Sequence, residues 1–101
     1  MINEKLVRDG IPELIRASGE EPEYRTVTGK ELDLYLRKKI VEEATELVES
    51  GSIDELVDIL EVVDAFMNLR KVDTGLIEMQ RHAKRLARGG FDEGFVLKMK
   101  E

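Results

Sequence analysis

The sequence predicts a mainly α-helical protein. It has only two prolines, its aromatic content is 5%, and its abundant Leu, Val, Ile, Glu and Lys favour helices. Apolar residues recur at helical spacing over two long stretches, which a Gly51-Ser52 turn separates. We therefore expect an antiparallel helical hairpin within a single domain over residues 1–101.

The N-terminal quarter of the chain is expected to hold short elements. Residues 6–10 form an extended piece that ends in a turn, and residues 11–17 form a short helix with Pro12 in its first turn. Residues 23–27 contain β-formers in weak alternation. We expect them to make a minor β-pair with residues 5–8.

Capping boxes mark the starts of the two long helices. The spacing S/T-x-x-E, which satisfies free amides at a helix start, occurs at Thr28–Glu31 and at Ser52–Glu55. A third helix is expected to begin at an Asp or Thr cap and to end at a Gly-Gly pair. The expected helices run from about Lys30 to Glu49, from about Ile53 to Arg70, and from Asp73 or Thr74 to Gly89-Gly90.

The composition excludes several classes of protein. With 22 acidic and 16 basic residues, the net charge of −6 is opposite to that of a typical nucleic-acid-binding domain. Because there is no cysteine and His82 is the one histidine, any metal would be a hard cation bound by oxygens. No apolar run of about 18 residues or signal-peptide core is present. We expect a soluble, cytoplasmic protein that binds neither nucleic acid nor membrane.

Each long helix is expected to direct two carboxylates along its buried side. At about 100° per residue, Glu43 falls in the middle of the apolar stripe of its helix, and Glu46 falls at the edge. Glu55 and Asp58 take the same two places on the next helix. Glu42 falls about 100° from Glu43, farther toward water. The hairpin turn then brings the two acidic pairs toward each other.

Four converging carboxylates need a counter-charge, because they repel one another and lose hydration. A divalent cation meets this need. Mg²⁺ takes oxygen ligands, keeps several waters and often bridges to substrate phosphates. Two alternatives stay open, namely a carboxylate–lysine network around Lys39 and protonation of the buried acids.

Three sets of motifs occur together in this chain. They are Lys5-Leu-Val-Arg-Asp9 with Ile11-Pro-Glu-Leu-Ile15, the pair Glu42-Glu43-x-x-Glu46 and Glu55-x-x-Asp58, and Arg88-Gly-Gly-Phe91. In this combination the sequence resembles the MazG-like all-α nucleoside triphosphate pyrophosphohydrolases, in a compact subgroup similar to phosphoribosyl-ATP pyrophosphohydrolase. The resemblance covers residues 5–91. The sequence differs from the subgroup at Gly10, where a lysine is usual, and in the short spacer between the acidic motifs.

The resemblance implies magnesium-dependent hydrolysis of a nucleoside triphosphate to the monophosphate and pyrophosphate, in nucleotide-pool housekeeping. It implies that Mg²⁺, or Mn²⁺ as a substitute, is held by Glu43, Glu46, Glu55 and Asp58. Glu42 would orient a ligand or position water, so Glu42 and Glu43 are the catalytic candidates.

Basic residues are candidates for binding the substrate phosphates. Lys39 lies near the acidic residues, and Lys84 and Arg88 share a helical face at i and i+4. An equally good explanation of Lys84 and Arg88 is that their positive charges stabilise the negative end of the helix dipole at the C-terminus of their helix. Arg8 and Asp9 are expected to form a structural ion pair.

Apolar residues cover more than half the circumference of the second long helix, whereas a helix packed on one side needs little more than about 100°. A two-fold dimer whose hairpins form a four-helix bundle would cover this surface. The resemblance also implies a homodimer or a dimer of dimers. Two alternatives to an enzyme remain, a non-catalytic module that binds a nucleotide or partner, and a purely structural bundle.

Overall fold

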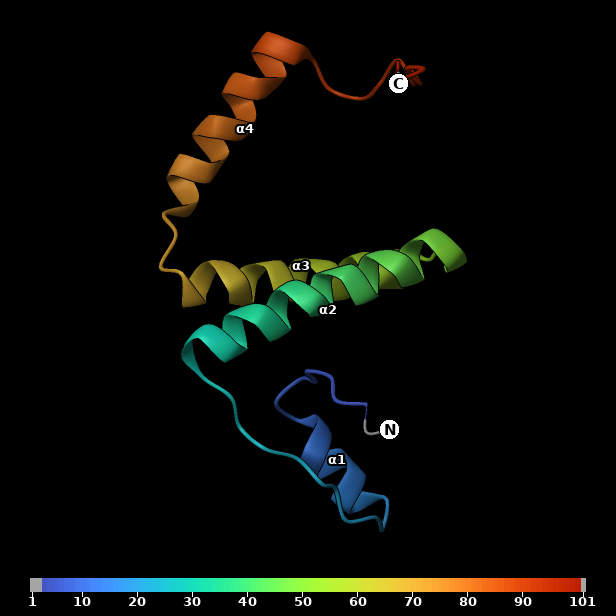
Figure 1. Ribbon diagram of the computed structural model, residues 1–101, viewed down its shortest axis with the longest axis vertical. Coiled ribbons are helices and arrows are strands. Elements are labelled where there is room, and N and C mark those ends of the chain that lie inside the picture. The colour runs from blue at the N-terminus through green and yellow to red at the C-terminus, as the bar shows by residue number, and fades with distance from the viewer. Residues whose placement is uncertain (1–2, 101) are drawn as a thin grey trace. The chain divides into compact units, whose positions relative to one another are not determined.

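The computed structural model describes residues 3–100 and contains four α-helices (Figure 1). They are α1 (Ile11–Ala17), α2 (Gly29–Ser50), α3 (Ile53–Leu69) and α4 (Thr74–Arg88). Because the described residues contain no strand, the all-helical class is confirmed, and the helices begin and end within a residue or two of their expected positions. The chain divides into two compact units, one up to Lys71 and one from Val72 onward. The single domain over residues 1–101 stays a prediction.

In the first unit, α2 and α3 pack along each other as the predicted antiparallel hairpin (Figure 1). Gly51 ends α2 with a φ of 64°, and its amide donates to the Leu47 carbonyl at 2.8 Å. Glycine adopts this left-handed conformation without a steric penalty, so the chain can reverse at once. Ser52 then begins α3, with its side chain accepting a hydrogen bond from the amide of Asp54.

The capping box expected at the start of α2 is not formed. Thr28 occupies the N-cap position in an extended conformation, but its side chain makes no capping hydrogen bond. Glu31, which would complete the box, instead pairs with Arg25 at 3.0 Å. A longer-range ion pair therefore replaces the local interaction that the sequence pattern predicted.

The expected β-pair between residues 5–8 and 23–27 is also absent from the described chain. Arg25 instead makes side-chain contacts with other segments, since its Nε donates to Glu4 Oε2 at 3.0 Å and its Nη2 donates to the hydroxyl of Tyr35 on α2 at 3.3 Å. An isolated pair of strands is marginal in water unless one face packs on a core. Tyr24, which would belong to such a face, is 58% exposed.

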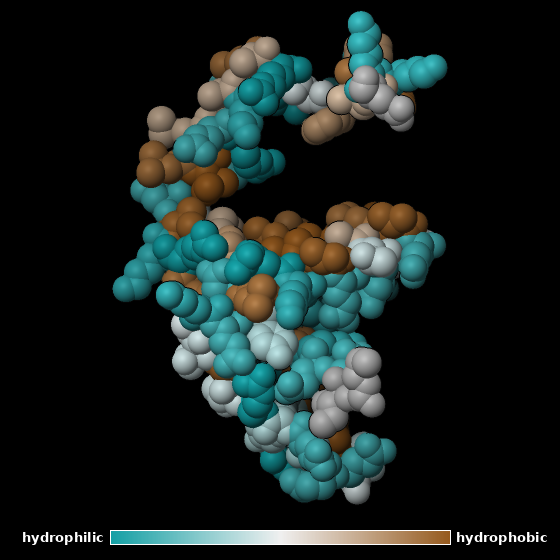
Figure 2. Space-filling model, in the orientation of Figure 1, coloured by the Kyte–Doolittle hydropathy of each residue, from teal (hydrophilic) through white to brown (hydrophobic). Residues whose placement is uncertain are grey.

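The core of the first unit is small. Leu36 and Glu43 on α2 are the most buried of the described residues, at 4% and 5% exposure. Many apolar side chains of the hairpin stay exposed, and hydrophobic residues form a band along α3 (Figure 2). The exposed apolar residues of the hairpin are Leu34, Val41, Val48, Ile53, Leu56, Val57 and Leu60.

The second unit consists of α4 and the tail that follows it. Asp73 caps the helix by accepting hydrogen bonds from the amides of Gly75 and Leu76. Arg85 and Arg88 lie in the last turn, where positive charge complements the helix dipole. Across the described residues, no helix combines the length and the apolar character needed to cross a membrane.

Candidate metal centre

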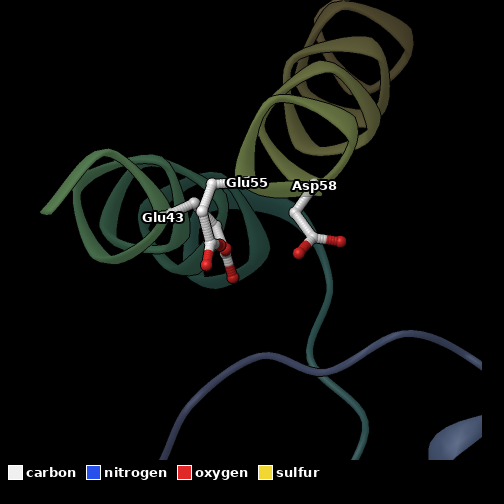
Figure 3. A group of neighbouring side chains, drawn as sticks. All are labelled: Glu43, Glu55 and Asp58. Atoms are coloured by element: carbon white, nitrogen blue, oxygen red, sulfur yellow. The ribbon is translucent and has the colours of Figure 1, made fainter. Parts of the chain in front are cut away.

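Three carboxylates meet between α2 and α3, on the side of the hairpin nearer to its turn. Glu43 projects from α2, and Glu55 and Asp58 project from successive turns of α3 (Figure 3). Each contributes one carboxylate oxygen to a group whose members lie within 4.8 Å of one another. The i, i+3 spacing of Glu55 and Asp58 places them on one helical face. The helix packing then supplies Glu43 as the third member.

The Glu43 carboxylate is nearly enclosed, yet it is incompletely bonded. Lys39 Nζ lies 3.3 Å from Oε1, whereas Oε2 is buried and has no hydrogen-bond partner. Leaving a buried acceptor unsatisfied costs about 1–3 kcal/mol, and more for a charged group. A cation at this oxygen would remove that cost.

The environment of Glu55 raises the pKa of its carboxyl group. Burial is the largest cause, followed by the nearby carboxylates of Glu43 and Glu46. Glu46 is outside the three-oxygen group, but it lies close enough to Glu55 to influence its protonation. The structure thus gathers three of the four predicted ligands and places the fourth beside them.

Lys39 forms the carboxylate–lysine network that the sequence left open. Its Nζ lies 3.2 Å from Glu42 Oε2 and 3.3 Å from Glu43 Oε1. Burial works to lower the pKa of Lys39, but the hydrogen bonds and charges of these two carboxylates outweigh it, so the pKa is raised. The network accounts for Glu42 and one oxygen of Glu43, and it leaves Glu55 and Asp58 without this counter-charge.

Glu42 lies at the edge of the cluster rather than in it. Its partial burial opposes ionisation, but the hydrogen bonds from Lys39 and Lys5 prevail and lower the pKa of its carboxyl group. The Lys5 ammonium reaches Glu42 Oε1 at 3.3 Å. Glu42 is therefore ionised and half-buried, next to the three grouped carboxylates.

Arg8 reaches the cluster from the N-terminal segment, which the sequence pattern did not foresee. Its Nη2 donates to Asp58 Oδ1 at 2.8 Å, so Arg8 pairs with Asp58 and the expected partnership with Asp9 is wrong. Arg8 and Asp58 are separated by 50 positions in the chain, and Lys5 and Glu42 by 37. No local spacing rule signals contacts of this range.

The other predicted residues lie in different surroundings. Lys84 and Arg88 are exposed on α4 in the second unit, and their proposed contact with phosphates stays a prediction. Glu61 and Asp64 are exposed on α3, which agrees with the outward direction that their helical positions predict.

A hollow of about 340 Å³ adjoins the cluster at Glu42 and Lys39. It is also lined by Lys5, Lys38, Tyr35 and Glu4, so three lysines and two carboxylates border it. A larger hollow of about 450 Å³ lies at the open end of the hairpin. Among its charged residues, Arg37 and Arg70 both pair with Asp33.

The three grouped oxygens are of the ligand type that a small divalent cation binds. Mg²⁺ binds oxygens at about 2.1 Å in an octahedron, so adjacent ligands lie about 3 Å apart and opposite ligands about 4.2 Å apart. The three oxygens lie within 4.8 Å of one another, so their side chains would have to move together around such an ion. The buried, unpaired oxygen of Glu43 is the atom that such an ion would satisfy.

No family model and no solved structure matches the chain. A protein from Mycolicibacterium smegmatis, itself described as uncharacterized, is 44% identical over 54 residues. The matched region is 54% of this chain and 55% of that protein, so the chain spans about half the length of this relative. The resemblance to the MazG-like enzymes therefore stays a prediction from the motifs.

Proposed function

We propose that the protein is a magnesium-dependent nucleotide pyrophosphohydrolase that converts a nucleoside triphosphate to the monophosphate and pyrophosphate. Glu43, Glu55 and Asp58 would hold the cation, with Glu46 beside them and Mn²⁺ as a substitute. The observation that carries the proposal is the Glu43 carboxylate, which has one buried oxygen without a hydrogen-bond partner and is grouped with two further carboxylates. The motif resemblance supplies the reaction.

The charges around the cluster favour a divalent cation over lysine pairing alone. Arg8, Lys5 and Lys39 pair with Asp58, Glu42 and Glu43. Within residues 3–100, no ion pair involves Glu55 or Glu46. A proton shared between Glu55 and Glu43, which the raised pKa of Glu55 favours, describes the metal-free form of the same site. Cation binding would displace that proton.

The hollow beside the cluster suits a polyphosphate. When bound, magnesium neutralises phosphate charge and lowers the pKa of an attacking water. Lys5, Lys38 and Lys39 line the hollow and would bind the phosphates. Phosphate binding by Lys84 and Arg88 is a separate proposal, which rests on their spacing along α4. Glu42, held ionised by its two lysines, can accept a hydrogen bond from a water and so orient it. Such a substrate accords with a cytoplasmic location, which we also propose.

We further propose that two chains assemble through the exposed apolar face of α3. Its residues recur at alternating steps of three and four, the pattern of a helix-packing seam. They are the exposed Ile53, Leu56 and Leu60, followed by the half-buried Val63 and Met67. Ile53 and Leu60 are 72% and 67% exposed. A second hairpin would cover this face and give a four-helix bundle in a homodimer or a dimer of dimers.

The reaction is tested by incubating the protein and Mg²⁺ with a panel of common and damaged nucleoside triphosphates, followed by ³¹P NMR. The expected products from at least one substrate are a monophosphate and pyrophosphate, and the Glu43→Gln variant should release neither. Release of orthophosphate and a diphosphate would contradict the proposed bond cleavage. Nucleotide binding without turnover across the panel would favour the non-catalytic module, and no binding of cation or nucleotide would favour a structural bundle.

A further inference from the structure

Arg8 is the counter-charge of the acidic cluster that α2 and α3 do not themselves provide. It belongs to the segment before α1, and its guanidinium binds Asp58 at 2.8 Å. The negative charges of Glu61 and of the cluster residue Glu43 also act on it. The side chains of Arg8 and Asp58 are 53% and 40% exposed, so water surrounds much of this contact.

Binding of a divalent cation would weaken the ion pair between Arg8 and Asp58. An ion held by Asp58 places two positive charges within a few ångströms of the guanidinium, and like charges at that distance repel. An exposed ion pair contributes little free energy, in the range of about 0–1 kcal/mol, so the arginine is readily displaced. Its long side chain can then turn to the nearest remaining anion without a change in the backbone.

We propose that Arg8 exchanges partners: it neutralises Asp58 while the site lacks a cation, and it binds a phosphate group of the substrate once the cation is in place. The inference rests on the proposed function, and it adds a residue outside the acidic motifs to the substrate contacts. Guanidinium suits both partners, because its planar fork matches carboxylate and phosphate oxygens alike. Metal-bound phosphate would lie next to Asp58, within reach of the side chain that the ion displaces.

The exchange gives Arg8 opposite effects on the two ligands, which a purely structural residue would not show. Removing it should strengthen binding of the cation alone, because a competitor for Asp58 is lost. Removing it should also weaken binding of the phosphate, because a charged hydrogen-bond donor is lost. Arg16 is the matched control, since it is an exposed arginine of the neighbouring helix α1 that pairs with Glu13 and Glu21 away from the cluster.

The experiment measures binding by the full chain in two titrations, first with Mn²⁺ alone and then with inorganic pyrophosphate at saturating Mn²⁺. For Arg8→Gln we expect Mn²⁺ affinity to rise by up to about fivefold and pyrophosphate affinity to fall by about tenfold. Arg8→Lys keeps the positive charge but loses the planar guanidinium that can make two parallel hydrogen bonds. It should keep the parent's Mn²⁺ affinity and lose part of the pyrophosphate affinity. Arg16→Gln should match the parent in both titrations.

Weaker Mn²⁺ binding by Arg8→Gln would show that the arginine holds Asp58 in its ligating orientation, and it would overturn the exchange while leaving the cation site intact. Pyrophosphate affinity equal to that of the parent would remove the phosphate contact and so overturn the proposal as well. If neither the parent nor any variant bound Mn²⁺, the cation site itself would be refuted, and the proposed function with it.

Discussion

Arg70 binds Asp33 with two hydrogen bonds that join the end of α3 to the start of α2. Its Nε and Nη2 donate to the two carboxylate oxygens at 2.7 and 3.1 Å, and its guanidinium lies over the Phe66 ring at 4.7 Å. This pair fastens the open end of the hairpin, while the Gly51 turn closes the other end. Because both ends of the hairpin are connected in this way, α2 and α3 keep the relative position in which Glu43 faces α3.

The first prediction concerns the ion pair between Asp33 and Arg70. Arg70 holds the pKa of Asp33 below its ordinary value of 3.8, with Arg37 adding to the effect. The ionised pair therefore stabilises the fold above about pH 4 and loses its contribution as pH falls through the lowered pKa. Asp33→Asn should lower the Tm by a few degrees at pH 7, and this difference should shrink in acid. Thermal melts at several pH values measure it.

The control for the Asp33–Arg70 pair is Glu78→Gln, which removes an exposed i, i+3 ion pair with Arg81 within α4. We expect its Tm to match the parent at every pH, since such pairs contribute little. A difference between Asp33→Asn and the parent that stayed constant down to pH 2 would show that the carboxylate acts through packing and not through its charge.

The second prediction contrasts acids inside and outside the cluster. Glu43→Gln and Glu55→Gln each remove a charged oxygen ligand, so cation affinity and turnover should fall by at least about 100-fold. Asp64→Asn and Glu61→Gln alter exposed carboxylates of α3 and should leave both quantities within about twofold of the parent. Isothermal titration with Mn²⁺ and initial rates provide the two readouts. Equal losses for both pairs would rule out a site on the inner face.

The third prediction links the cation to stability. A ligand that binds only the folded protein stabilises it, by about 2.7 kcal/mol at 100 times the dissociation constant. Saturating Mg²⁺ or Mn²⁺ should therefore raise the Tm of the parent by about ten degrees, at constant protein concentration. Glu43→Gln should lose most of this gain.

The same variant should be no less stable than the parent when the metal is removed with a chelator. The amide of glutamine brings no charge and can donate a hydrogen bond to Glu55, so it relieves repulsion among the grouped carboxylates. A clear loss of metal-free stability in Glu43→Gln would indicate that Lys39 already satisfies the site and that the cluster serves the fold.

The fourth prediction concerns assembly. Light scattering coupled to size exclusion should give about twice or four times the mass of one chain at micromolar concentration. Leu60→Glu should shift the protein to monomer, because a charge on this seam would lose hydration in a bundle but not on an exposed face. Leu14→Glu, at a similarly exposed position of α1, is the control and should keep the parent's mass. A parent that stays monomeric and active at all concentrations contradicts the dimer.

The sequence by itself determined the helices, the turn and the phase of the carboxylates. Periodicity placed Glu43 and Glu55 on the inner faces of α2 and α3, and the structure groups both of them with Asp58. Gly51 and Ser52 marked the reversal through their preferred backbone and capping roles. These features depend on residues no more than about four positions apart, so a linear reading contains the information that fixes them.

Only the tertiary structure decided which charges meet. Arg8 lies against Asp58, Lys5 lies against Glu42, and Arg25 takes Glu31 away from the expected cap at Thr28. These partners are brought together by the path of irregular segments, whose course no periodicity encodes, and by the packing of α2 on α3. Long side chains then reach whichever opposite charge lies nearest in space, so their pairing follows from the fold and not from spacing along the chain.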